Sequence, residues 1–179
     1  MNPRYHIAPL VYTPEIIQSL ADLLIETVAN GGSVSFMHPL EENVAQAFWR
    51  SSINAAIAGE RVVLGAFDGA KLIGTVTLIL NCPPNQPHRA EVAKMMVRVA
   101  YRGQGVGRAL MHAAEKIALQ KGRTLITLDT AEDEGAAGLY EALGFQKVGV
   151  IPDFALKPHG GLSGTIIYYK QLAAEVAGE

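Results

Sequence analysis

Apolar residues recur at helical spacing in the first third of the chain. One amphipathic stripe consists of Ile16, Ile17, Leu20, Leu23 and Leu24. Thr13-Pro14-Glu15 before it supplies an N-cap, a proline at the first helical position and an acid in the first turn. We expect this helix to end at Asn30-Gly31-Gly32, and a second helix to cover residues 41–58, with Gly59 ending it.

The next pattern is typical of strands. Residues 61–67 and 71–80 are rich in β-branched and apolar residues, and Asp68-Gly69 between them predicts a tight antiparallel hairpin. Three prolines make residues 81–88 a loop. The remaining predicted elements are strand 89–99, helix 105–121, strand 124–130, helix 134–143, strand 145–151 and strand 165–172.

This order of elements predicts an α/β fold of mixed type. Its central sheet would have about six or seven strands, some antiparallel, with helices on both faces. The chain contains no internal repeat, low-complexity tract or long linker. We therefore expect residues 1–179 to form a single domain.

The segment Arg102–Gly107, Arg-Gly-Gln-Gly-Val-Gly, lies between an apolar strand and a predicted helix. A strand that enters a helix through glycines leaves several backbone N–H groups unpaired near one point, and the helix dipole adds partial positive charge there. Such a site favours a phosphate group.

Two common nucleotide loops fit this segment poorly. A Walker A loop needs Lys and then Ser or Thr after its last glycine, whereas Arg108-Ala109 follow Gly107. A dinucleotide-binding turn needs three glycines, and only Gly105 and Gly107 are in place. Asp129 lies 22 residues after Gly107, near the position of a ribose-binding acid, so this alternative stays open at the level of sequence.

The pattern R-x-x-G-x-G, read as Arg102, Gly105 and Gly107, resembles the coenzyme A diphosphate loop of the GNAT acyltransferases. Downstream, residues 138–145 (Gly-Leu-Tyr-Glu-Ala-Leu-Gly-Phe) are similar to the fourth helix of that family and the strand after it. Residues 31–37 and 89–130 resemble the tabtoxin-resistance branch in particular. The resemblance runs roughly from residue 20 to 172 and implies the GNAT fold, with acetyl-CoA as cosubstrate of an N-acetyltransferase.

The resemblance also implies a set of cofactor-binding residues. Backbone amides of Val97 and Val99 would pair with the pantetheine arm, those of residues 103–107 would surround the diphosphate, and Arg102 or Arg108 would supply charge. Asp133 stands where many relatives have an asparagine that contacts the cofactor. The complete predicted set is Met96, Val97, Val99, Arg102, Gly103, Gln104, Gly105, Val106, Gly107, Arg108 and Asp133.

Amide formation on an alkylamine makes a base useful. With a pKa of about 10.4, only about 0.1% of such an amine is neutral near pH 7.4. Glu91 and Asp129 are the candidate bases, on the strand before the glycine loop and the strand after the helix. The alternative for Glu91 is an ion pair with Arg89, Arg98 or Lys94 on a solvated edge.

Charge also builds on the thioester oxygen and then on the departing sulfur. A backbone N–H near Val97 is the predicted donor to the oxygen. Tyr140 resembles in position the tyrosine that acts as the family's general acid toward the sulfur, because a phenol with a pKa of about 10 can protonate a thiolate. Its alternative role is that of a core aromatic on the apolar face of its helix.

The acceptor is less well defined. The loop after the first helix resembles a substrate-lining loop of the tabtoxin-resistance branch, which implies a small amino-acid-like or β-lactam amine. It could equally be a generic lid. The candidate substrate residues are Ser33, Ser35, Phe36 and Met37. A protein N-terminal or lysine acetyltransferase and a non-catalytic acetyl-CoA sensor remain alternatives, and a closed pocket roofed by residues 31–38 would count against the protein acetyltransferase.

Composition adds constraints on location and partners. A net charge of -2 and a pI near 6.2 do not predict a nucleic-acid surface. With a lone Cys82, no signal peptide and no long apolar stretch, the expected protein is cytoplasmic and not membrane-bound. Five scattered histidines predict no metal site. The resemblance leaves a homodimer as an option.

Overall fold

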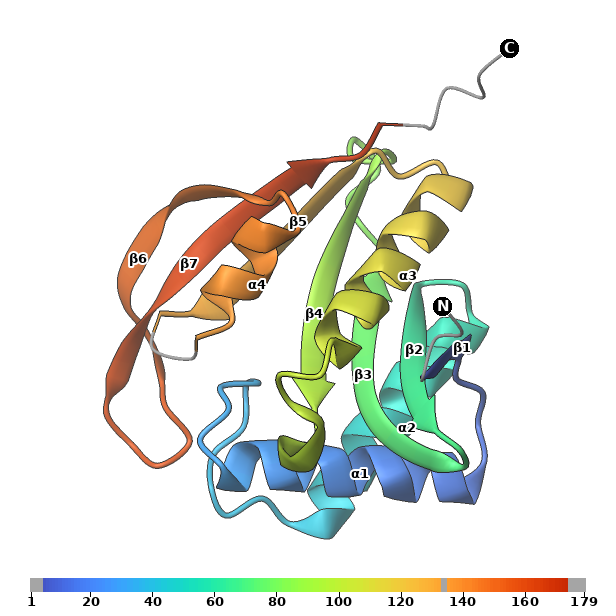
Figure 1. The fold of residues 1–179 in the computed structure, drawn as a ribbon, viewed down its shortest axis with the longest axis vertical. Helices are drawn as coiled ribbons and strands as arrows, with labels where there is room; N and C mark the ends of the chain where they lie inside the picture. The colour runs from blue at the N-terminus through green and yellow to red at the C-terminus, as the bar shows by residue number, and fades with distance from the viewer. Residues whose placement is uncertain (1–4, 133–134, 174–179) are drawn as a thin grey trace.

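The computed structural model describes residues 5–132 and 135–173. Within them, seven strands form one sheet in the order β1-β2-β3-β4-β5-β7-β6 (Figure 1). The strands are β1 His6–Pro9, β2 Arg61–Asp68, β3 Lys71–Ile79, β4 Arg89–Val97, β5 Leu125–Ala131, β6 Gln146–Leu156 and β7 Leu162–Gln171. The helices are α1 Pro14–Ala29, α2 Glu42–Ile57, α3 Val106–Gln120 and α4 Ala137–Ala142, with a 3-10 turn η1 at Val99–Tyr101.

The first helix forms as its sequence predicts. Thr13 is the N-cap, its hydroxyl accepts the Ile16 N–H at 3.1 Å, and Pro14 occupies the first helical position. The apolar stripe is buried, with Leu20, Leu23 and Leu24 fully inaccessible to solvent. Burial of this stripe therefore fixes α1 against the sheet.

Strand pairing makes the sheet mixed. β1 to β4 pair antiparallel in sequence order, β4 and β5 are parallel, and β7 is antiparallel to both β5 and β6. This confirms the predicted fold class. The antiparallel half also removes the dinucleotide-binding alternative as a fold, because that class is built on a doubly wound, mostly parallel sheet.

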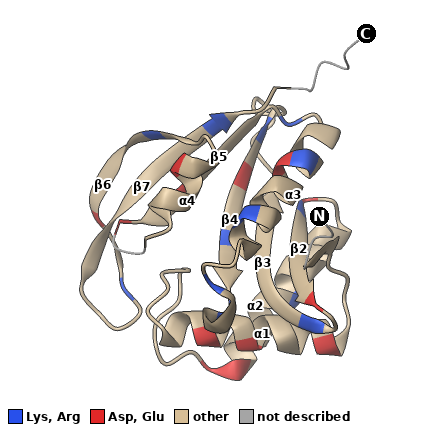
Figure 2. Ribbon diagram, viewed as in Figure 1, with Lys and Arg blue, Asp and Glu red and all other residues tan. Residues whose placement is uncertain are grey.

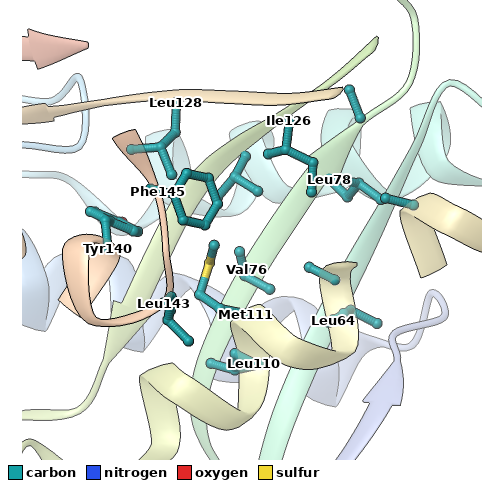
Figure 3. Packing of buried hydrophobic residues seen from close by; sticks show 14 of the residues in the cluster. Leu64, Val76, Leu78, Leu110, Met111, Ile126, Leu128, Tyr140, Leu143 and Phe145 are labelled. Carbon is teal, nitrogen blue, oxygen red and sulfur yellow. The ribbon is translucent and has the colours of Figure 1, made fainter. Parts of the chain in front are cut away.

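Helices cover both faces of the sheet. α3 and α4 pack on one face, where Met111 and Phe145 lie among strand residues such as Val76, Ile126 and Leu128 (Figure 3). α1 and α2 pack on the other face around Trp49, which is fully buried. The two clusters hold the sheet between two helical layers.

Several boundaries differ from the sequence prediction. β1 was not predicted, because a strand of four residues, none of them buried, carries too little periodicity. β4 ends at Val97 and Val99 begins a 3-10 turn. β6 extends to Leu156, past a register shift between Ile151 and Ala155, and β7 begins at Leu162, so the region between residues 152 and 164 is mostly hairpin.

Candidate active site

The central feature of the sheet is the short contact between β4 and β5. These parallel strands pair only at Arg89–Glu91 against Leu125–Thr127. Beyond this stretch they diverge, as the V between β4 and β5 in Figure 1 shows. Two adjoining cavities open along the divergence, and both are lined by Val34, Met95 and Ala136.

The larger cavity, here called the glycine-loop cavity, has a volume of about 790 Å³. Its walls come from the end of α1 and the loop after it, the end of β4, the glycine loop, the first turn of α3 and the start of α4. Eight of the predicted cofactor residues line it: Met96, Val97, Arg102, Gly103, Gly105, Val106, Gly107 and Arg108.

The first turn of α3 presents unpaired donors to this cavity. Gly105 is the N-cap in a left-handed conformation, with φ of 85°, and offers no side-chain cap. The first amide bonded back into the helix is that of Ala109, which donates to the Gly105 carbonyl at 3.0 Å. The amides of Val106, Gly107 and Arg108 therefore have no acceptor within the helix. No acidic residue in this turn competes for them.

The absence of a side chain at Gly107 leaves space in the cavity beside the first turn of α3. A Cβ built there would lie 3.2 Å from Leu139 Cδ2 and 3.6 Å from Met95 Sδ, and both neighbours also line the cavity. A side chain would narrow the space beside the free amides. The uncapped turn, the adjacent glycines and two arginines thus fit the diphosphate of a coenzyme.

Two predicted cofactor residues do not line this cavity. The Val99 amide, expected to meet the pantetheine arm, already donates to Glu26 Oε1 at 2.8 Å. Gln104 turns its side chain away, because it accepts the Tyr5 hydroxyl and donates to the Ala100 carbonyl. Asp133 lies outside the described residues.

The smaller cavity, here called the Asp129 cavity, has a volume of about 190 Å³. Hydroxyls from three segments line it, together with a carboxylate, a phenol and an amine: Ser33, Ser35, Thr130, Ser163, Thr165, Asp129, Tyr140 and Lys94. Phe154, Ala155 and Leu156 of β6 close another side. Of the predicted catalytic and substrate residues, Asp129, Tyr140, Ser33 and Ser35 are brought together here.

Asp129 and Glu91 have different environments. Asp129 lies near the end of β5, where Oδ2 accepts the Thr165 hydroxyl at 2.8 Å. Glu91 lines neither cavity and forms an ion pair with Arg89 at 3.4 Å. Glu91 thus has the environment of its alternative role, an ion pair with Arg89, because it sits in the paired part of the β4–β5 ladder, before the strands separate.

The position of Tyr140 is compatible with both predicted roles, that of a core aromatic and that of an acid at the cleft. It is 5% exposed, and its ring contacts Phe145 edge-on with centroids 5.9 Å apart. The same residue lines the Asp129 cavity. Its ring is thus part of the core while the residue still reaches the cleft.

The substrate loop is only partly at the cavity. Phe36 packs edge-on against Phe48, with centroids 5.2 Å apart, and belongs to the cluster around α1 and α2. Met37 is 46% exposed. Neither residue lines the glycine-loop cavity or the Asp129 cavity, because the segment turns away from the cleft after Ser35, whose φ is 74°.

Sequence reasoning missed Lys94 as a cavity residue. It lies at a register shift of β4 with φ of 53°, a conformation that lysine rarely adopts. Its Nζ donates to Ser35 Oγ at 3.1 Å and lies 5.7 Å from the centre of the Phe48 ring. Burial lowers the pKa of Lys94, and the nearby Asp129 and Glu91 carboxylates partly oppose this shift. No sequence signal marks this bulge.

The described residues outside the two cavities show neither a metal-ligand cluster nor a membrane-spanning helix. Lys and Arg are interspersed with Asp and Glu on β4 and α3 (Figure 2). Among residues 5–132 and 135–173, no three His, Cys, Asp or Glu side chains gather as a metal would require. None of the described helices has the length and apolar character to cross a membrane.

Comparison with protein families decides the relationship. The model of the acetyltransferase (GNAT) family matches residues 24–145, which include α2 and the glycine loop. The chain belongs to this family. The resemblance seen in the sequence is confirmed at that level, as membership of an acetyltransferase family. No comparison singles out the tabtoxin-resistance branch.

Individual relatives agree with the family. N-acetyltransferase 8 of Rattus norvegicus is 34% identical over 86 residues, a match that covers 47% of this chain and 39% of the relative. The chain thus spans well under half the length of the curated relatives it matches.

Two of the similar solved structures illustrate the shared fold. The yncA protein of Salmonella typhimurium, solved with its cofactor acetyl-CoA, has a TM-score of 0.76 and 16% identity over 98% of both chains. A GCN5-related N-acetyltransferase of Kribbella flavida has a TM-score of 0.77 and 22% identity, covering 94% of this chain and 98% of that one.

Proposed function

We propose that this protein transfers acetyl from acetyl-CoA to the primary amine of a small, amino-acid-like molecule, by direct attack in a ternary complex. The carrying observation is the pair of adjoining cavities. One is large and lined by the free amides of the glycine loop, and the other is small and contains a carboxylate. Val34, Met95 and Ala136 line both, so a donor in one can meet an acceptor in the other.

The donor site binds through charge and backbone. Acetyl-CoA supplies an acetyl group activated as a thioester. The amides of Val106, Gly107 and Arg108 would hold its diphosphate, with the side chains of Arg102 and Arg108 at the same cavity wall. The predicted amide contact of Val97 stays part of this proposal, whereas Val99 is excluded by its bond to Glu26.

Asp129 is the proposed base. Near neutral pH, most of an alkylamine in water is protonated to the ammonium form. A carboxylate in the acceptor cavity attracts that cation and can also take its proton, directly or through water. The Thr165 hydroxyl donates to Oδ2 and orients the carboxylate. This assigns to Asp129 the role that the sequence left open between it and Glu91.

Tyr140 is the proposed acid. Its hydroxyl would protonate the departing sulfur, since a phenol is close enough in pKa to a thiol for this transfer. Burial of the ring between Phe145 and Tyr168 holds the side chain in place. A phenol free to rotate would lose the alignment of its hydroxyl with the departing sulfur.

The size of the acceptor cavity favours a small substrate. A volume of about 190 Å³, bounded by residues 33–35 and by Phe154–Leu156, suits an amino acid better than a polypeptide. This supports the small-molecule proposal over the protein acetyltransferase.

The exposed side chains of the β6–β7 hairpin, such as Val148 at 64%, support a homodimer. Light scattering of the wild type and of Val148→Ser would test this oligomeric state.

The test is acetyl-CoA consumption across a panel of amino acids, amine antibiotics, a β-lactam amino acid and peptides with free N-termini. We expect turnover with small amines, and a fall of about 10²- to 10⁴-fold in kcat for Asp129→Asn. Glu91→Gln is the matched control and should keep most activity. Coenzyme binding without turnover of any acceptor would favour the sensor, and turnover confined to peptides would favour the protein acetyltransferase.

A further inference from the structure

The Asp129 cavity contains two opposite charges that are not bonded to each other. Lys94 and Asp129 both line it, yet none of the ion pairs within residues 5–132 and 135–173 joins Lys94 to a carboxylate. The ammonium instead bonds a neutral hydroxyl, that of Ser35, and lies over the Phe48 ring. The direct partners of this half-buried cation are thus neutral, and the Asp129 and Glu91 carboxylates act on it only from farther away, so its ammonium can still accept an anionic partner.

The backbone is arranged to bring this cation into the cleft. β4 changes register against β3 between Thr75 and Thr77, and Lys94 takes a left-handed φ at that bulge. Bulges redirect side chains next to functional sites, and unfavourable φ values are kept where the surrounding structure requires them. The conformation is therefore consistent with a binding role for this side chain.

Burial and the nearby Arg61 lower the pKa of Lys94, and Asp129 and Glu91 oppose this shift only in part, so the cavity disfavours the charged form. A carboxylate entering the cavity would reverse this effect. Asp129, held by Thr165, offers the opposite charge for an ammonium. Together the two side chains complement a molecule that carries both an amine and a carboxylate.

We propose that Lys94 binds the carboxylate of the acceptor, so that the acceptor class is free amino acids rather than simple amines. This inference rests on the proposed function, since it identifies the substrate of the same cavity. Asp129 receives the amine and Lys94 receives the acid group. The Ser35 hydroxyl, which accepts from the Lys94 ammonium, and the Phe48 ring beside it would hold that ammonium at the cavity.

The test measures binding separately from turnover. Calorimetric titration of the enzyme saturated with coenzyme A, using the twenty common amino acids and their carboxamides, compares a carboxylate with a neutral group of similar shape. We expect at least one amino acid to bind about 10- to 100-fold more tightly than its amide, the range of a charge-assisted hydrogen bond. Lys94→Met should remove this difference without weakening the amide. Lys94→Arg should retain much of it.

Lys116→Met, at an exposed position of α3, is the matched control and should change neither affinity. Equal binding of acids and amides to wild type overturns the inference, as does an equal loss of both in Lys94→Met or the absence of any bound amino acid. The proposed function fails separately, if amino acids bind but no acetyl product forms. Conversely, the enzyme could acetylate amines that lack a carboxylate and bind them as tightly as the acids. That result would overturn the role of Lys94 but would keep the proposed acetyltransferase activity.

Discussion

The Glu26 carboxylate bonds the backbone amide of Val99 at 2.8 Å, joining the last turn of α1 to the segment just after β4. Its second oxygen accepts Arg98 Nη1 at 2.7 Å. Both partners lie immediately before the glycine loop. The carboxylate therefore sets the distance between α1 and the loop, two walls of the same cavity.

Glu26→Gln should loosen this junction. The ion pair with Arg98 is mostly buried, so loss of the charge should cost about 1 to 2 kcal/mol of unfolding free energy. Acetyl-CoA affinity should fall several-fold because the loop is less well held. Urea unfolding and titration calorimetry measure the two effects. Asp22→Asn, at an exposed site on the same helix, should leave both unchanged; equal behaviour of the two variants would show that Glu26 does not support the loop.

Gly107→Ala should weaken coenzyme binding with little loss of stability. The added Cβ would lie 3.2 Å from Leu139 Cδ2, so Leu139 must move away, and the new methyl group itself narrows the space beside the free amides. We expect the Kd for acetyl-CoA to rise about tenfold, or about 1.4 kcal/mol. Gly138→Ala is the control, since its Cβ would meet nothing within 4 Å. An unchanged Kd in Gly107→Ala would mean that the diphosphate binds elsewhere.

Tyr140→Phe should lower kcat by about 10²-fold or more and leave KM for acetyl-CoA nearly constant, because only the acid is removed while the ring keeps its packing. Steady-state kinetics with a thiol-detecting assay measures this. Tyr169→Phe removes a hydroxyl that bonds Gln146 on the β6–β7 hairpin and should behave as wild type. A rise in KM with constant kcat would instead assign Tyr140 to binding.

Tyr168 should make the protein sensitive to alkaline pH. Burial raises the pKa of its hydroxyl above 10.0, and the hydrogen bond to Glu141 acts in the same direction. Between the unfolded and folded pKa values, the folded state keeps a proton that the unfolded chain has lost. This contribution to stability is therefore complete below about pH 10 and declines above it. Urea midpoints from about pH 8 to 11 should fall less steeply for Tyr168→Phe, and parallel curves would contradict the assignment.

Elements with strong local signals were predictable. The capped start of α1, the Asp68-Gly69 hairpin and the glycine loop before α3 each combine periodicity with turn or cap chemistry. The β6–β7 hairpin was only half predicted. β6 is an edge strand with almost every residue exposed, so no alternation of buried and exposed positions marks its extent.

The part of the site formed by the backbone of the glycine loop was predictable from sequence. The part that depends on how distant strands are arranged was less predictable. The glycine loop carries its function in its residue types. Whether Glu91 or Asp129 reaches the cleft depends on where β4 and β5 separate, a long-range property that neither residue reveals. Lys94 depends on a bulge, and a lysine with positive φ has no local sequence signature.

The three-residue ladder between β4 and β5 has a mechanical consequence. Among the described residues, strand pairing joins the two halves of the sheet only there. Across the cleft, side chains such as Phe145 and Met111 pack together, and the His38 N–H donates to the Pro158 carbonyl at 2.9 Å. Small sliding of that packing can widen both cavities without breaking a strand pair. The joint can thus act as a pivot for entry and release, and amide exchange should be slowest at Ala90 and Ile126, both fully buried.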